Sequence, residues 1–166
     1  RENREIPPLQ YNRVYALKDR YPEFTIVING GITRIDQAAA HLERVDGVMV
    51  GREAYQNPWS LIEVDHVLFG DTPTYPSRLD VLEAYKTYMR DELEKGVPLK
   101  RLARHLLGLF QGEPGARTWR RALSEAAFRS GADLTAIEAA QNSLDTTRRE
   151  HAAVSAASNQ GMGLRL

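Results

Sequence analysis

The sequence contains no cysteine. That absence excludes disulfide scaffolds, thiolate zinc sites and cysteine nucleophiles within this chain. The four histidines (His41, His66, His105 and His151) are far apart and show no spacing typical of metal ligands, so no metal site is expected. No apolar run approaches the ~20 residues of a membrane-spanning helix, and the start shows no signal-peptide pattern, so no membrane association is expected.

An excess of charge of one sign is also lacking, since 22 basic side chains balance 22 acidic ones. Residues 1–75 hold eight basic and eleven acidic side chains, and residues 76–166 hold fourteen and eleven. Residues 100–121 have six basic side chains and one acidic side chain, Glu113. This cluster points to an anionic partner, although the solvated face of a surface helix is the commoner explanation of such a cluster. The first residue, Arg1, is not methionine and suggests a piece of a longer polypeptide.

Short β-type segments alternate with helical patterns in the first part of the chain. Residues 24–28 are apolar and rich in β-branched side chains, and residues 45–50 contain three valines, which predicts two buried strands, the first of them buried on both faces. Residues 11–20 predict a helix before the first strand. A second helix follows Thr33, a good N-cap with Asp36 three residues later, and another short helix follows the second strand. This order predicts a parallel α/β sheet.

Two strands alone do not form a stable parallel sheet, and a closed eight-stranded barrel takes ~250 residues. Residues 1–72 therefore predict the last βα units of an incomplete, TIM-type α/β barrel. Four amphipathic helices with short loops predict an all-α four-helix bundle over residues 73–145, with Ser77 as the first N-cap and a second helix reaching Phe110. Residues 146–166 lack a sustained apolar stripe, and we expect them to be a disordered tail.

Glycines follow both predicted strands at the same point. Asn29, Gly30 and Gly31 end the first strand, and Gly51 and Arg52 end the second. Glycine lets backbone N–H groups approach a ligand, a helix start favours negative charge, and a guanidinium suits a phosphate. Either loop alone is also explained as an ordinary turn. Their matching positions favour a phosphate-binding barrel, in which the last two strands form a recurrent phosphate site.

These residues belong to a wider pattern that resembles the tRNA-dihydrouridine synthases. The resemblance rests on residues 29–32 (Asn-Gly-Gly-Ile) and 45–58, while residues 1–9 and 108–117 resemble the A-type subfamily in particular. It covers about residues 1–143. It implies a flavin-dependent oxidoreductase with an N-terminal barrel and a C-terminal helical tRNA-binding domain, of which this chain is expected to be the C-terminal portion.

The resemblance further implies FMN as cofactor and NADPH as reductant. It implies that Asn29, Gly30, Gly31, Gly51 and Arg52 hold the FMN phosphate. The implied reaction is reduction of uridine to 5,6-dihydrouridine in the D-loop of tRNA, at positions 20 and 20a for the A-type. The family's general acid is a cysteine on an earlier barrel loop. No catalytic residue is therefore expected in this chain, which we expect to be inactive alone.

One face of the predicted helix over residues 115–129 is basic. At ~100° per residue, Arg117, Arg120 and Arg121 share an arc opposite the apolar residues. Glu125, four residues after Arg121, can pair with it, whereas Arg117 and Arg120 have no such partner. The resemblance implies that Arg117 and Arg120, together with Arg1 and Arg4, contact tRNA. Weaker candidates are Lys100, Arg101 and Arg104.

Two alternatives stay open. One is another FMN- or phosphate-binding barrel oxidoreductase with a small substrate, although such a substrate does not require the basic helical region. The other is a non-catalytic RNA-binding helical module, with the α/β part as a scaffold. For the tRNA-modifying enzyme we expect a cytoplasmic, monomeric parent protein that has tRNA as its partner and binds neither a membrane nor a metal.

Overall fold

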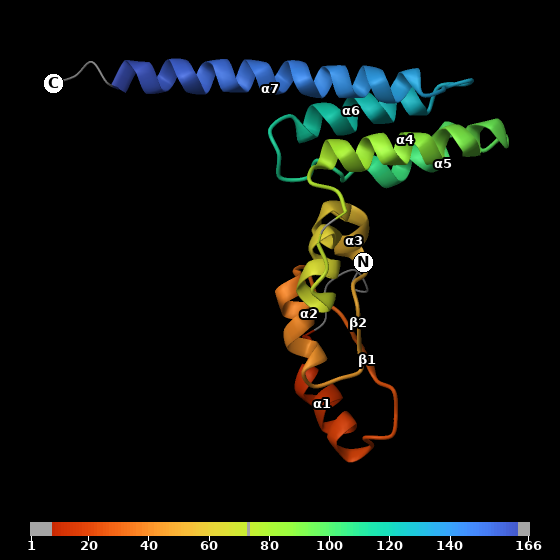
Figure 1. Ribbon diagram of the computed structural model, residues 1–166, viewed down its shortest axis with the longest axis vertical. Coiled ribbons are helices and arrows are strands. Elements are labelled where there is room, and N and C mark those ends of the chain that lie inside the picture. The colour runs from red at the N-terminus through yellow and green to blue at the C-terminus, as the bar shows by residue number, and fades with distance from the viewer. Residues whose placement is uncertain (1–7, 73, 163–166) are drawn as a thin grey trace. The chain divides into compact units, whose positions relative to one another are not determined.

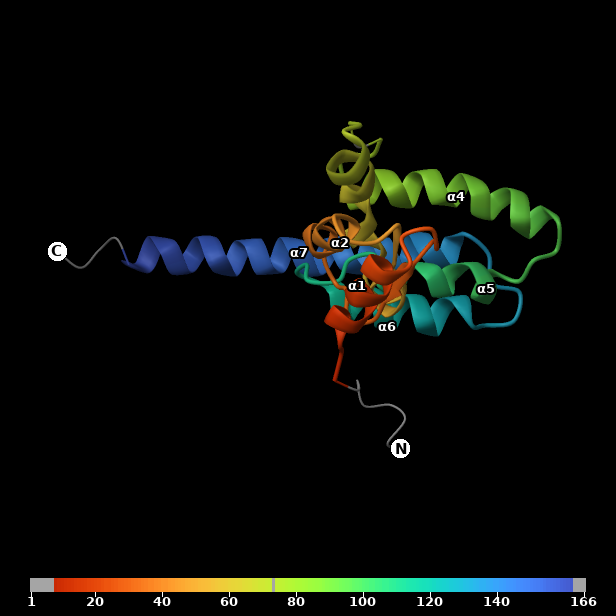
Figure 2. The ribbon, with the colours of Figure 1, turned by 90° about the horizontal axis from the view of Figure 1, so that it is seen from below.

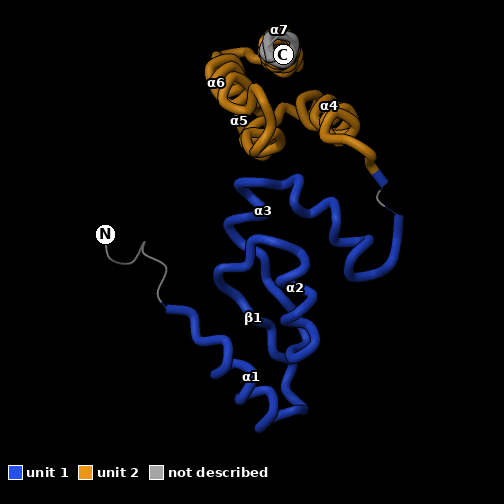
Figure 3. The backbone as a smooth tube through the Cα atoms, turned by 90° about the vertical axis from the view of Figure 1, so that its left-hand side faces the viewer, with its two compact units in different colours: residues 1–74 blue, residues 75–166 orange. Residues whose placement is uncertain are grey.

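The chain folds as two compact units, each with its own apolar core. The computed structural model describes residues 8–72 and 74–162 of the 166-residue chain. The chain divides into the two units between Thr74 and Tyr75 (Figure 3), shortly after residue 72, where the sequence predicts the boundary.

The first unit contains a two-stranded parallel sheet (Figure 1). β1 (Val27–Asn29) and β2 (Gly47–Met49) pair with Ile28 opposite Val48. α1 (Tyr11–Arg20) precedes β1, and α2 (Ile35–Leu42) connects the two strands. The predicted order of strand, helix and strand is confirmed, although both strands are shorter than the apolar segments that predicted them.

Among the described residues, only one face of this sheet is covered, whereas the sequence predicts burial on both faces. Ile28 is 2% exposed and packs with Ile32, Ala38 and Val45 on the side where α1 and α2 lie (Figure 1). Val27, on the other face, is 57% exposed. Burial on both faces is not found within the described residues, because β-branched residues indicate a strand but do not indicate which elements cover it.

A polar contact fixes the entry into both strands. The Asp46 carboxylate accepts a hydrogen bond from the Ile26 N–H (2.8 Å) and forms an ion pair with Lys18 of α1 (2.8 Å). The hydrogen bond from Ile26 is the main cause that holds the pKa of the Asp46 carboxyl below its ordinary value, and the Lys18 ammonium is the second cause. The carboxylate thereby ties α1 to the sheet.

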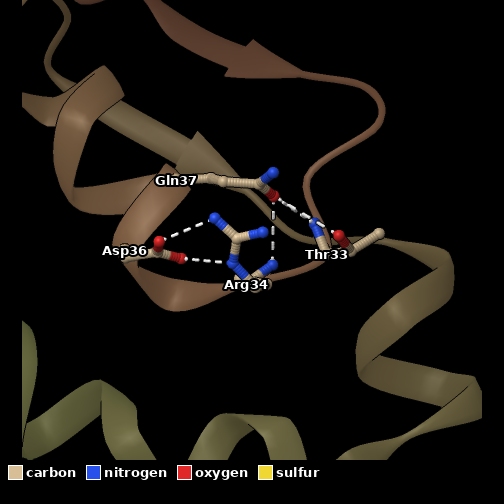
Figure 4. A network of polar contacts seen from close by, with 4 residues as sticks. All are labelled: Thr33, Arg34, Asp36 and Gln37. Carbon is tan, nitrogen blue, oxygen red and sulfur yellow. Dashed lines mark hydrogen bonds and ion pairs between the residues drawn. The ribbon is translucent and has the colours of Figure 1, made fainter.

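The start of α2 differs from the prediction. The sequence predicts Thr33 as its N-cap, but the helix begins at Ile35, with Arg34 at the N-cap position. Gln37 Oε1 accepts hydrogen bonds from the N–H groups of Thr33 (3.1 Å) and Arg34 (3.2 Å), as Figure 4 shows. The side chain that accepts from these backbone N–H groups is therefore a glutamine of the first helical turn. A prediction that looks for Ser or Thr at the N-cap position does not identify it.

Three short helical segments follow β2. α3 (Arg52–Gln56) begins directly after Gly51, and this agrees with the short helix predicted there. η2 (Pro58–Glu63) is a 3-10 helix, and η3 (Asp65–Phe69) is a single π-helical turn.

The second unit contains only helical elements in its described residues. α4 (Arg78–Glu94) begins after Ser77, whose Oγ accepts a hydrogen bond from the Asp80 N–H (3.2 Å), and the predicted N-cap is confirmed. The loops that join α4 to α5 and α6 to α7 lie at the same end of the unit (Figure 2). The remaining elements are α5 (Leu99–Ala103), η4 (Arg104–Leu106), α6 (Ala116–Ala127) and α7 (Thr135–Met162).

The second predicted helix of this unit is interrupted. The apolar stripe predicts one helix up to Phe110, but regular α-helix ends at Ala103 and gives way to a 3-10 turn and further turns. Two side chains hydrogen-bond to carbonyls of this segment: Trp119 Nε1 donates to Leu106 (2.8 Å), and Arg78 Nη1 donates to Leu109 (2.8 Å). Tertiary contacts thus replace part of the helical ladder, and the regular four-helix bundle is not confirmed.

The prediction of a disordered tail over residues 146–166 was wrong for residues 146–162, and residues 163–166 lie outside the described residues. α7 continues to Met162, well beyond residue 146, and Figure 1 shows it extending past the end of α6. An ion pair between Arg148 and Glu113 (3.5 Å) stabilises the helix just after residue 146. The residues that follow are rich in alanine, which has the highest helix propensity. High helix propensity explains a helix without an apolar stripe. Among the described helices, none combines the length and the apolar character needed to cross a membrane.

Candidate phosphate-binding loops and arginine surface

The parallel pairing brings the two predicted glycine loops together. Asn29 and Met49 are partners at the carboxyl ends of β1 and β2, so residues 29–31 and 51–52, called the glycine loops below, leave the same edge of the sheet. They line one cavity of about 530 Å³. Its lining contains all five predicted residues: Asn29, Gly30, Gly31, Gly51 and Arg52. The same cavity also includes Ile32, Thr33, Met49, Glu53 and Gln56, which the sequence reasoning did not select.

The first glycine loop has a backbone that requires glycine. Gly30 has φ +115° and Gly31 has φ +67°, both in the range that L side chains rarely adopt. A Cβ atom added to Gly31 would lie 2.5 Å from Leu9 Cδ1, and one added to Gly30 would lie 2.9 Å from Leu9 Cδ2. At Gly30 and Gly31 the loop therefore presents backbone alone to the cavity.

Arg52 is the cation of this site. It is the first residue of α3, its side chain is exposed, and no hydrogen bond or ion pair joins it to another described residue. The neighbouring Glu53 lines the same cavity, but its Oε1 accepts a hydrogen bond from Asn57 Nδ2 (2.9 Å). One charged guanidinium thus remains available to an anion beside the glycine loops.

Arg34 follows the first glycine loop closely in the sequence, but Asp36 already balances its charge. Its guanidinium donates two hydrogen bonds to the Asp36 carboxylate, at 2.8 and 2.7 Å (Figure 4). This contact lowers the pKa of Asp36 and raises the pKa of Arg34 from their ordinary values. Arg34 is therefore a poorer candidate for an anionic ligand than Arg52.

α6 presents three arginines on its exposed side. Arg117, Arg120 and Arg121 are exposed, while Trp119 and Leu123 are fully buried, as the helical spacing predicts. We call these three residues the arginine surface. Within residues 8–72 and 74–162 none of the three forms an ion pair, and Arg121 does not pair with Glu125 as the sequence suggested. Arg1 and Arg4 lie outside the described residues.

Other basic residues of this unit serve structural contacts. Arg78 and Arg148 both approach the Glu113 carboxylate, at 3.7 and 3.5 Å. Burial lowers the pKa of Arg78 from its ordinary value, with Glu113 opposing that shift. For metals, no group of three or more potential His, Asp or Glu ligands exists in the part of the chain that the structure describes.

Comparison with known proteins identifies the family. The family model for dihydrouridine synthase (Dus) matches residues 1–146. The chain belongs to the dihydrouridine synthase family. It is similar to proteins named tRNA-dihydrouridine(20/20a) synthase: that of Shewanella oneidensis is 54% identical over 146 residues, which are 88% of this chain and 44% of that protein. That of Escherichia coli K12 is 54% identical over 138 residues, covering 83% and 40%.

A third relative of the same name, from Vibrio cholerae, is 49% identical over 140 residues, which are 84% of this chain and 43% of that protein. This Dus-family chain thus spans less than half the length of these relatives. Both glycine loops and the arginine surface lie within the residues that the family model matches. The predicted family is confirmed, while the roles of the individual site residues stay predictions.

Proposed function

We propose that this chain is the C-terminal portion of an A-type tRNA-dihydrouridine(20/20a) synthase, which reduces uridines 20 and 20a in the D-loop of tRNA to 5,6-dihydrouridine. The names of the relatives at 49–54% identity support the reaction and the substrate. The structural observation behind the proposal is the convergence of both glycine loops and Arg52 on one cavity.

The uncovered face of the sheet supports an incomplete barrel. In a TIM barrel the helices cover the outer face of each strand and the inner face lines the barrel. α1 and α2 cover the Ile28 side, whereas Val27 and Met49, on the other side, are 57% and 47% exposed. We therefore assign Val27 and Met49 to the barrel interior and the glycine loops to its carboxyl end, where barrel active sites lie.

The residues around the cavity fit the phosphate of FMN. Gly30 and Gly31 have no Cβ to obstruct an approaching oxygen, and Asn29 and Gly51 line the same cavity. Arg52 supplies the compensating charge. The chemistry supplied by a bound flavin is hydride transfer to C6 of the uracil ring, with NADPH as the reductant. Since this chain has no cysteine, it contributes cofactor binding and not the thiol acid that protonates C5.

The helical unit is the proposed tRNA-binding part. Arg117 and Arg120 are exposed, without carboxylate partners among the described residues, and are suited to phosphate oxygens. We propose that Arg1 and Arg4 join them on tRNA, as the resemblance to the A-type implies. We also propose that the complete protein acts in the cytoplasm as a monomer.

The proposed reaction is tested with the complete polypeptide and unmodified tRNA. Purified protein with bound flavin, NADPH and a transcript that contains U20 and U20a should gain two mass units per reduced uridine. Nuclease mapping should place the change at these two positions. Dihydrouridine elsewhere in the tRNA would contradict the A-type assignment, and no reduction of any uridine by flavin-loaded protein would contradict the proposed activity.

A further inference from the structure

The first residue of α1 is bound to the first glycine loop. The Tyr11 hydroxyl donates a hydrogen bond of 2.6 Å to the carbonyl oxygen of Gly30, 19 residues later in the chain. The Tyr11 ring lies edge-on to the ring of buried His41, with centroids 4.5 Å apart, and packs against the core of the first unit. The hydroxyl is therefore held in place by a packed aromatic ring.

Leu9 and Tyr11 together fill one side of this loop. The Leu9 methyl groups occupy the space that Cβ atoms of Gly30 and Gly31 would take, and the Tyr11 hydroxyl lies 3.1 Å from the Cβ position of Gly31. The cavity is lined by Gly30 and Gly31 but by neither Leu9 nor Tyr11. The loop thus has a packed side toward α1 and an open side toward the cavity.

The hydrogen bond fixes the orientation of one peptide group. In a trans peptide the C=O of one residue and the N–H of the next point in opposite directions, and no described peptide bond is cis. Because the Gly30 carbonyl points to Tyr11 on the packed side, the Gly31 N–H points away from it, toward the cavity. This N–H has no backbone acceptor in the described part of the chain.

We propose that Tyr11 is a positioning residue that holds the Gly30–Gly31 peptide with its N–H toward the flavin phosphate; this rests on the proposed function. Glycine loops rotate their peptide planes at little cost, since both residues have access to positive and negative φ. A flipped peptide would turn the Gly30 carbonyl oxygen toward the phosphate and repel it. Tyr11 prevents that flip without touching the ligand.

The test compares two hydroxyl deletions in the complete polypeptide. Tyr11→Phe removes the hydrogen bond to Gly30, whereas Tyr15→Phe, one turn later in α1, removes an equally short hydrogen bond to His41 Nδ1 (2.6 Å). Each protein is titrated with FMN and with riboflavin, which lacks the phosphate, and binding is followed by flavin fluorescence. We expect Tyr11→Phe to weaken FMN binding about tenfold and to leave riboflavin unchanged, as the loss of one hydrogen bond to the phosphate predicts. Tyr15→Phe should change neither affinity.

The remaining outcomes separate the inference from the proposed function. Equal weakening of FMN and riboflavin by Tyr11→Phe, or an unchanged affinity for FMN, would overturn the positioning role. A similar loss of FMN affinity in Tyr15→Phe would overturn it too, since the effect would then come from the stability of α1, which melting temperatures of both variants report. If the unmodified protein bound riboflavin as tightly as FMN, the phosphate site itself would be wrong.

Discussion

Trp119 and Leu106 are joined by a buried hydrogen bond in which the indole N–H of α6 donates to the Leu106 carbonyl at 2.8 Å. The Trp119 ring is fully buried and meets Phe110 edge to face, with ring centroids 4.9 Å apart. Edge-to-face aromatic pairs stabilise a fold by more than the burial of their apolar area alone. This one residue therefore joins the core of the helical unit to the segment where regular helix stops.

Replacing Trp119 with Phe should destabilise the helical unit by about 2–3 kcal/mol, because it leaves the Leu106 carbonyl without its donor and creates a cavity. Urea denaturation followed by circular dichroism measures the change. Phe128→Leu is the matched control, since Phe128 is 60% exposed and its replacement should change the unfolding free energy by less than about 0.5 kcal/mol. Equal effects of the two substitutions would show that Trp119 is not the centre of this core.

The sequence predicts local features of this chain better than the contacts between them. Gly30 and Gly51 could be placed after strands because glycine and the apolar segments before them are local signals. The hydrogen bond from Tyr11 to Gly30 joins residues 19 positions apart and has no local signal. The break after Ala103 depends on side chains of α4 and α6, so the apolar stripe alone predicted a continuous helix.

Gly31→Ala should lower stability more than Gly70→Ala, although both glycines have similar positive φ values, +67° and +76°. An alanine in this conformation costs about 1–2 kcal/mol, and this term applies to both positions. At Gly31 the new Cβ also lies 2.5 Å from Leu9, whereas nothing lies within 4 Å at Gly70. This contact is with the terminal methyl of a side chain that is 40% exposed, so moving it adds less than the ~1–3 kcal/mol that overpacking costs in a rigid core. Thermal unfolding of the complete polypeptide measures both, and equal shifts would contradict the packing of Leu9 against the loop.

Arg52→Ala should weaken FMN binding by about 1.5–3 kcal/mol, because it removes a charge-assisted contact to the phosphate. Binding of riboflavin should stay the same. Arg34→Ala is the control, since it removes an exposed arginine of the same unit whose charge Asp36 already balances. Fluorescence titration gives all four affinities. A loss of FMN affinity no larger in Arg52→Ala than in Arg34→Ala would remove Arg52 from the phosphate site.

The double substitution Arg117→Ala and Arg120→Ala should weaken tRNA binding. It should also reduce the slope of log K against the logarithm of the salt concentration by about two, one for each lost phosphate contact. FMN content should not change. Arg44→Ala with Lys95→Ala removes the same total charge from residues that pair with Asp19 and Glu92. Binding isotherms at several salt concentrations distinguish the two. If both double variants reduced the slope equally, overall charge and not the arginine surface would explain the effect.

The two units should differ in whether they fold when each is produced alone. Residues 75–166 contain a contiguous core around Trp119 and Phe110 and should unfold cooperatively as a monomer. The described part of residues 1–74 holds a sheet of two strands, each paired on one edge only. Phe24, which precedes β1, is 56% exposed, and Val27, within β1, is 57% exposed. Unpaired edges and an uncovered apolar face favour aggregation or an unfolded chain. Circular dichroism melts and sedimentation velocity check both expectations. A monomeric, cooperatively unfolding fragment of residues 1–74 would contradict the assignment of Val27 and Met49 to a barrel interior, because that face would then need no covering layer.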